Sequence, residues 1–192
     1  MIVKSYTYFA TKGLQILFMR FCFVCMLGIG TTLWAQTSGS RNVNLNLQEI
    51  ALLDIEPNTS TLNFSFTAPS EAGNTLTTPS ANTTKWLNYT SAVTVGNTRN
   101  VTAHIDATLP GVAIKIQAGA VAAGGGGTLG VSAGQVTLST TPVNIITGIG
   151  GAYTGNGTNR GHQLTISLEV SDFSELSQTT NEVITITYTI TD

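Results

Sequence analysis

The sequence predicts an all-β fold, an antiparallel β-sandwich of eight or nine short strands. Apolar and polar residues alternate with a period of two in most segments after residue 41. Glycine and proline punctuate these segments at short intervals. No segment repeats apolar residues with the 3.6-residue period of a helix. Many short strands without helices are typical of sandwiches and barrels.

The first 35 residues are predicted to be a secretory signal peptide. Their charges are all positive, and residues 21–34 form an uncharged, mostly apolar run that ends at the small residue Ala35. About 14 apolar residues are few for a membrane span of about 20, although an uncleaved anchor is the alternative. We therefore expect cleavage after Ala35, export through the inner membrane, and a single domain over residues 36–192.

The composition of the expected mature chain excludes several classes of protein. Both cysteines, Cys22 and Cys25, lie in the leader, so residues 36–192 cannot form a disulfide or a thiolate metal site. These residues include five basic and ten acidic side chains, a net charge of −5. The basic residues form no patch that could contact a phosphate backbone, so nucleic acid is not an expected partner. Charged residues are only 9% of the chain, so solubility must depend on Thr, Ser and Asn.

Each expected strand follows from local alternation. Val43, Leu45 and Leu47 alternate with asparagines, and the phase then slips at Gln48-Glu49, so residues 43–55 contain one or two strands. Asp172 to Ser177 allow one helical turn at most. The further strands are expected around residues 62–66, 85–94, 101–107, 112–117, 135–139, 143–147, 164–170 and 184–190.

Two glycine-rich stretches interrupt this series. Residues 122–130 contain four consecutive glycines, and we interpret them as a flexible hairpin tip, with a close-approach surface for a ligand or subunit as the alternative. Residues 147–161 contain six glycines and are expected to form a long surface loop. They lack the Gly-Lys-Ser/Thr and the following helix of a phosphate-binding loop, so we exclude that function.

The sequence gives little support for catalysis, and we expect no enzyme activity, no cofactor and no metal. The two histidines, His104 and His162, lack the spacing of a zinc site. No Gly-x-Ser-x-Gly elbow suggests a serine nucleophile. Asp172 and Glu175 are close enough in sequence to form a carboxylate pair, but we favour the interpretation that they lie in a solvated loop.

Trp86 and Tyr89 are the candidate ligand aromatics. Two aromatic residues close together on one strand can stack on a sugar, and a host or surface glycan is the ligand that this interpretation implies. The alternative is that both anchor the core, which is the usual role of strand aromatics in a sandwich.

The two ends of the mature chain carry the clearest patterns. The candidate N-terminal donor segment, residues 41–55, contains Val43, Leu45, Leu47 and Ile50, and burial of these four side chains is worth roughly 6–12 kcal/mol. A domain is stable by only about 5–15 kcal/mol, so a subunit without this strand would be close to unfolding. The segment either completes its own sandwich or pairs with an exposed edge of a neighbour. The candidate C-terminal assembly strand contains Ile184, Ile186, Tyr188 and Ile190.

These features resemble bacterial fimbrial subunits of the chaperone–usher type, whose fold is a pilin-like, immunoglobulin-like sandwich. The resemblance rests on the signal peptide, the alternating segment from Asn42 onward, the cysteine-free body rich in Thr, Asn and Gly, and the closing segment Asn181 to Asp192. It implies that a periplasmic chaperone binds the C-terminal strand and that an outer-membrane usher is a further partner. It also implies that the N-terminal segment is donated to another subunit, at the cell surface or outside the cell.

The sequence therefore predicts a structural or adhesive subunit of a cell-surface fibre, whose partners are other copies of itself or related subunits. The alternative is a monomeric secreted β-sandwich that binds a ligand, for example a carbohydrate.

Overall fold

The computed structural model describes residues 38–192, so the predicted signal peptide at 1–35 lies outside the described residues. The chain divides into two units, residues 1–45 and residues 46–192. The described part of the first, residues 38–45, contains no helix or strand. Within residues 38–192, no helix is long and apolar enough to cross a membrane.

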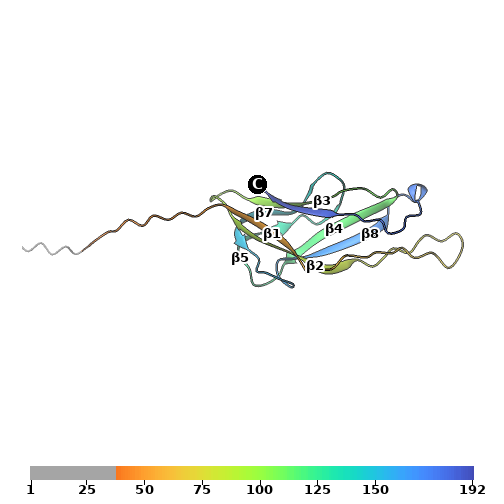
Figure 1. Cartoon of the computed structure of the whole chain (residues 1–192), viewed down its shortest axis with the longest axis horizontal. Coiled ribbons are helices and arrows are strands. Elements are labelled where there is room, and N and C mark those ends of the chain that lie inside the picture. Colours follow the sequence, from red (N-terminus) through yellow and green to blue (C-terminus); the bar gives the residue numbers. More distant parts are fainter. Residues whose placement is uncertain (1–37) are drawn as a thin grey trace, which may run out of the picture. The chain divides into compact units, whose positions relative to one another are not determined.

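The second unit consists of strands and one short turn of 3-10 helix, η1 (Phe173–Glu175) (Figure 1). The strands are β1 (Ile50–Glu56), β2 (Asn82–Ala92), β3 (Arg99–Ile105), β4 (Val112–Val121), β5 (Gly126–Ser132), β6 (Gln135–Thr137), β7 (Val143–Tyr153), β8 (His162–Val170) and β9 (Ile186–Thr191). All pairings between them are antiparallel. The all-β antiparallel fold predicted from the sequence is confirmed.

The strands form one continuous sheet in the order β6-β4-β8-β2-β7-β3-β9, with β1 added to β2 and β5 added to β7. Strand β2 joins the two halves, because its first part pairs with β8 and its last part pairs with β7 through Thr90↔Tyr153 and Ser91↔Ala152. Inward-facing side chains of both halves form a single cluster, so the sheet folds over on itself and encloses one core.

The alternation of buried and exposed positions along the strands determines which residues lie in the core. In β3, Val101, Ala103 and Ile105 are buried, whereas the residues between them are partly exposed. The other fully buried aliphatic side chains of the cluster include Leu87, Ile116, Ile145, Ile146, Ile149 and Leu164. The period of two is interrupted in β7, where the neighbours Ile145 and Ile146 are both buried and the register with β3 shifts. Burial of one such side chain contributes about 1.5–3 kcal/mol, which makes this cluster the main source of the stability of the fold.

Strand β5 corrects the prediction of a hairpin tip at residues 122–130. Its residues Gly126 and Gly127 pair with Tyr153 and Ala152 of β7. A Cβ at Gly127 would lie 2.0 Å from the carbonyl oxygen of Gly151, and φ at Gly127 is +86°. Only glycine allows the two backbones to approach this closely, so the glycines belong to a strand contact within the chain.

Two expected strands are absent from the described residues. Residues 43–47 have no strand assignment, and neither do residues 62–66. Leu62 and Phe64 nevertheless pack on the core, so the alternation in this segment reflects burial of one face and not pairing with a neighbouring strand.

Lys85 of β2 stabilises the turn that follows β1, because its ammonium group donates hydrogen bonds to the Pro57 carbonyl and to Ser60 Oγ.

Candidate functional site

The candidate donor residues are divided between the two units. Val43 and Leu45 belong to the first unit, where their side chains are 87% and 89% exposed. Leu47 belongs to the second unit and is 76% exposed. Ile50 is the first residue of β1 and pairs with Ala92 of β2. The expected segment 41–55 is therefore two pieces, residues 41–49 without secondary structure and a strand integrated into the sheet.

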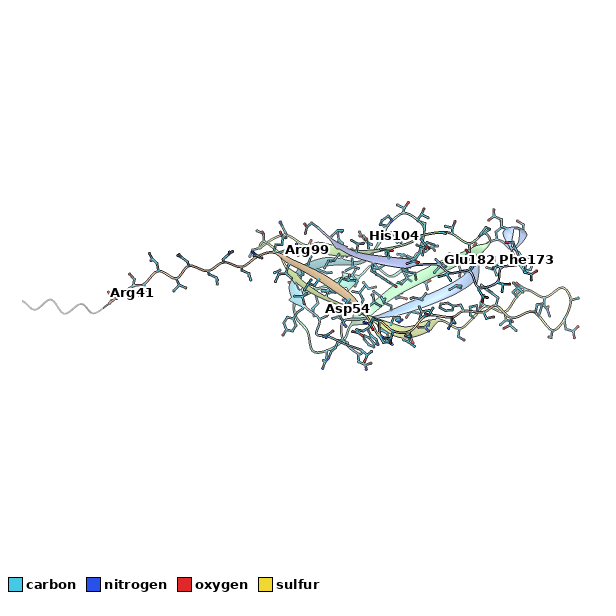
Figure 2. All side chains as sticks on the ribbon, in the orientation of Figure 1. Arg41, Asp54, Arg99, His104, Phe173 and Glu182 are labelled. Atoms are coloured by element: carbon cyan, nitrogen blue, oxygen red, sulfur yellow. The ribbon has the colours of Figure 1, made fainter. Side chains whose placement is uncertain are left out.

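Arg99, at the start of β3, fixes the point where β1 begins (Figure 2). Its side chain is 5% exposed, and Nη2 lies 2.5 Å from Oε1 of Glu49. Nε donates to Oδ1 of Asp192 at 2.7 Å. Nη1 donates to the carbonyl oxygens of Ile50 and Ala92. One guanidinium group thus ties together the start of β1, the end of β2 and the end of β9, which we call the Arg99 clamp.

The candidate C-terminal assembly residues lie on one face of the last segment. Ile186, Tyr188 and Ile190 are in β9, and Ile184 precedes it; all four are partly buried against the core. Burial raises the pKa of Tyr188 above its ordinary value. Before the strand, the amide of Thr185 donates to Oδ1 of Asp106 at 2.9 Å, which lowers the pKa of that carboxyl group.

Strands β1 and β9 are both edge strands within residues 46–192. β1 pairs only with β2, through seven residues, and β9 pairs only with β3, through six. Each therefore has one edge along which its backbone N–H and C=O groups have no strand partner in the described part of the chain. Such an edge is a template for the addition of another strand.

Trp86 and Tyr89 do not form a common surface. They are three positions apart in β2, so their side chains leave opposite faces of the sheet. Trp86 is partly exposed, whereas Tyr89 is 3% exposed and belongs to the core. The structure therefore gives no support to the expected aromatic pair, because one ligand cannot contact both rings.

Tyr89 instead takes part in a buried polar group with His162, the first residue of β8. The two rings stack with centroids 5.8 Å apart, and the phenol oxygen lies 3.2 Å from Nε2 of His162. The phenol donates its one hydrogen to the carbonyl oxygen of Leu129. Nδ1 of His162 lies 2.8 Å from the Gly119 carbonyl oxygen, so the proton of the neutral ring is on Nδ1. This group links β2, β4, β5 and β8 inside the fold.

Burial determines the ionisation of both members of this group. Burial lowers the pKa of His162 below its ordinary value, although hydrogen bonds to the Gly119 and Leu129 carbonyls act in the opposite direction. Burial also raises the pKa of Tyr89. A neutral imidazole that is 1% exposed cannot reach a substrate in solution, so His162 stabilises the fold and is not placed to act as a catalytic base.

The other residues considered for chemistry are also not assembled into a site. Oδ1 of Asp172 caps η1 by accepting hydrogen bonds from the amide and the hydroxyl of Ser174, which lower the pKa of this carboxyl group. Glu175 is exposed in the same turn. His104 of β3 is partly exposed, with its Nδ1 buried and unpartnered in the described residues. Residues 38–192 contain no group of three or more His, Cys, Asp or Glu that could hold a metal ion.

Comparison of the chain with protein-family models, with characterised proteins and with solved structures finds no match.

Sequence reasoning did not predict the Arg99 clamp. The partners of Arg99 are 7, 50 and 93 positions away, so no local spacing connects them. One signal was present, because Arg99 is one of only five basic residues in residues 36–192 and it opens an alternating strand on the apolar phase of Val101 and Ala103. A charged residue in that phase must find partners when the strand is buried.

Proposed function

We propose that the chain is a structural or adhesive subunit of a cell-surface fibre and that subunits join by strand addition. In this proposal residues 42–47 of one copy pair with the free edge of β9 in another copy. The observation that carries the proposal is the exposure of Val43, Leu45 and Leu47, three alternating apolar side chains at 87%, 89% and 76%. Export to the periplasm, and then to the cell surface or the medium, is part of the same proposal.

A return of residues 42–47 to their own β1 is disfavoured by the turn it would need. The turn would consist of Gln48 and Glu49, whereas two-residue hairpins require residues that accept positive φ, chiefly Gly, Asn and Asp. Neither residue is among those with positive φ. Glu49 is also held by Arg99. A second copy is therefore a better partner for this segment than its own β1.

Estimates of the free energies involved indicate how the contact between two subunits would be stabilised. Burial of three apolar side chains contributes roughly 5–9 kcal/mol. Association costs about 4–15 kcal/mol, so side chains alone would not hold two subunits together. Main-chain hydrogen bonds along the edge of β9 would have to supply the remainder, as in other cases of strand addition. The partly exposed apolar row of β9 offers the surface that the donor residues would cover.

The test compares two substitutions at adjacent positions of the mature chain, residues 36–192. Leu45→Asp adds a charge on the apolar phase, and Asn44→Asp adds the same charge on the polar phase. We expect multimers that resist SDS for the unaltered chain and for Asn44→Asp, and monomers for Leu45→Asp, as measured by gel electrophoresis and light scattering.

A peptide of residues 41–48 supplies the second measurement. It should raise the melting temperature of a chain that begins at Glu49, because it would fill the edge that the shortened subunit leaves open. A mature chain that remains monomeric, together with a melting temperature that the peptide does not change, would rule out strand addition.

A further inference from the structure

A cleft of about 310 Å³ lies between β1, β2 and the residues that follow β7. Its central residue is Thr90 of β2, which pairs with Leu52 of β1 on one side and with Tyr153 of β7 on the other. Leu52 and Tyr153 are 64% and 55% exposed, so this row is open to solvent. Asp54 and Asn156 complete the polar rim, and Figure 2 shows Asp54 on β1.

The ring of Tyr153 has a fixed position on which a ligand could stack. Tyr153 pairs with Gly126 of β5, and a Cβ at Gly126 would lie 3.0 Å from Cε1 of the tyrosine ring. The backbone of Gly126 therefore covers one side of the tyrosine ring, and the remainder of the ring is exposed to solvent. An aromatic ring over a cross-strand glycine is a fixed arrangement, so a ligand that stacks on it loses little protein entropy.

The loop that follows Tyr153 and forms one side of the cleft is also held in place by contacts within the chain. Gly155 and Gly157 have φ of +83° and +99°, which turn the chain sharply after β7. Nδ2 of Asn88 donates to the Gly157 carbonyl at 2.9 Å. Nη1 of Arg160 donates to the Ala123 carbonyl at 2.6 Å. The loop that carries Asn156 is thus attached to β2 and to the segment before β5.

The chemistry of the lining selects the class of ligand. It combines an exposed aromatic ring and an aliphatic side chain with a carboxylate, an amide and a hydroxyl group. No Lys, Arg or His lines the cleft, and Asp54 would repel an anion. A pyranose ring has an apolar C–H face that can stack on a phenol and hydroxyls that donate strongly to a carboxylate. The volume is at the lower end of the range of small-molecule sites.

We propose that this cleft binds a neutral saccharide, with one sugar ring stacked on Tyr153 and its hydroxyls bonded to Asp54 and Asn156. The exposed aromatic ring of this site is Tyr153 and not the expected pair of Trp86 and Tyr89, although the buried Tyr89 is among the lining residues. The site is independent of strand addition. Because the cleft is shallow and holds about one ring, the dissociation constant is expected to be about 1–10 mM.

Saturation-transfer NMR on the complete mature chain tests this assignment, since the method detects weak ligands of large assemblies. The probes are maltotriose, cellotriose and N,N′,N″-triacetylchitotriose at about 10 mM, and sorbitol is the open-chain control. At least one trisaccharide should receive saturation on the protons of one ring face, and sorbitol should receive none. The absence of transfer to all three trisaccharides above the sorbitol level would overturn the assignment.

Substitutions in the cleft test whether the saturation transfer comes from this site. Tyr153→Ala should abolish the transfer, Tyr153→Phe should keep it because the ring remains, and Asp54→Asn should weaken binding at least about fivefold. Phe173→Ala is the matched control, because Phe173 is 58% exposed and lies in η1, apart from Asp54 (Figure 2). If Tyr153→Ala does not fold, Asp54→Asn on the exposed edge strand decides the question. Unchanged transfer in Asp54→Asn, or equal loss in Phe173→Ala, would also overturn the assignment.

Discussion

Two segments of this chain carry the same sequence pattern and have different structures. Residues 42–47 and 184–190 both alternate apolar and polar side chains with a period of two. The first has no secondary structure and is exposed, whereas the second includes most of β9 (Ile186–Thr191), pairs with β3 and covers part of the core. Alternation therefore identifies a segment with one apolar face, and the partner of that face has to come from elsewhere in the fold or from another molecule.

The residues between the apolar positions explain part of the difference. In β9 they are threonines, whose β-branched side chains favour the extended backbone. In residues 42–47 they are asparagines, which are depleted in strands. The N-terminal segment thus depends on a partner for its conformation, while β9 has both intrinsic preference and a neighbour.

The largest difference between the two segments should appear on truncation of one apolar side chain in each. Tyr188→Ala removes a partly buried ring from β9 and is expected to reduce the free energy of unfolding by about 3 kcal/mol. Leu45→Ala should change it by less than about 0.5 kcal/mol in the monomer, because Leu45 is 89% exposed. Denaturant titration of dilute protein measures both values. Equal losses would mean that residues 42–47 are part of the fold.

A smaller effect is expected at the Arg99 clamp, which connects the base of the N-terminal segment with the end of β9. Arg99→Gln leaves the carbonyls of Ile50 and Ala92 without their donor and should cost about 2 kcal/mol. Glu49→Gln is the matched control and should cost less than about 1 kcal/mol, because this carboxylate is 57% exposed. Thermal and denaturant unfolding compare the two variants. A greater loss for Glu49→Gln would show that the ion pair, and not the backbone hydrogen bonds, holds the clamp.

The smallest effect concerns pH and should act on the body that contains β9. The pKa of His162 is lowered in the folded chain, so below about pH 6.5 the unfolded chain takes up a proton that the folded chain does not. Stability should therefore be full above this pH and fall as the pH drops, by at most about 1.4 kcal/mol per unit, until the folded group is also protonated.

His162→Gln should remove the pH dependence between about pH 7 and 5, where Asp and Glu contribute little. Hydrogen exchange of β9 at both pH values, compared with that of residues 42–47, shows whether the loss is confined to the body. An unchanged slope in His162→Gln would assign the effect to other groups.

The fold class was predictable because alternation in β2, β3, β4, β8 and β9 coincides with the faces that are buried. Strand β5 was not, because its glycines carry no side-chain pattern and their role is the close approach of two backbones at Gly127 and Gly151. Residues 62–66 show the opposite case. Leu62 and Phe64 alternate and are partly buried, yet the segment has no strand partner in the described structure.

The sites were less predictable than the fold. The terminal segments were recognisable because their patterns are local. The Arg99 clamp and the cleft at Tyr153 depend on contacts between residues far apart in sequence, such as Leu52, Thr90 and Tyr153 in one row. A row of this kind follows from strand order and register, which the alternation of single segments does not specify.

The Arg99 clamp has a mechanical consequence. In a fibre joined as we propose, each subunit is pulled at two points, where residues 42–47 leave the body at Glu49 and along β9, where the next subunit is attached. The guanidinium group bonds directly to Glu49 and to Asp192 at the end of β9. Tension would therefore cross the subunit through one buried side chain, and the seven pairs that hold β1 to β2 would be protected from peeling apart under load.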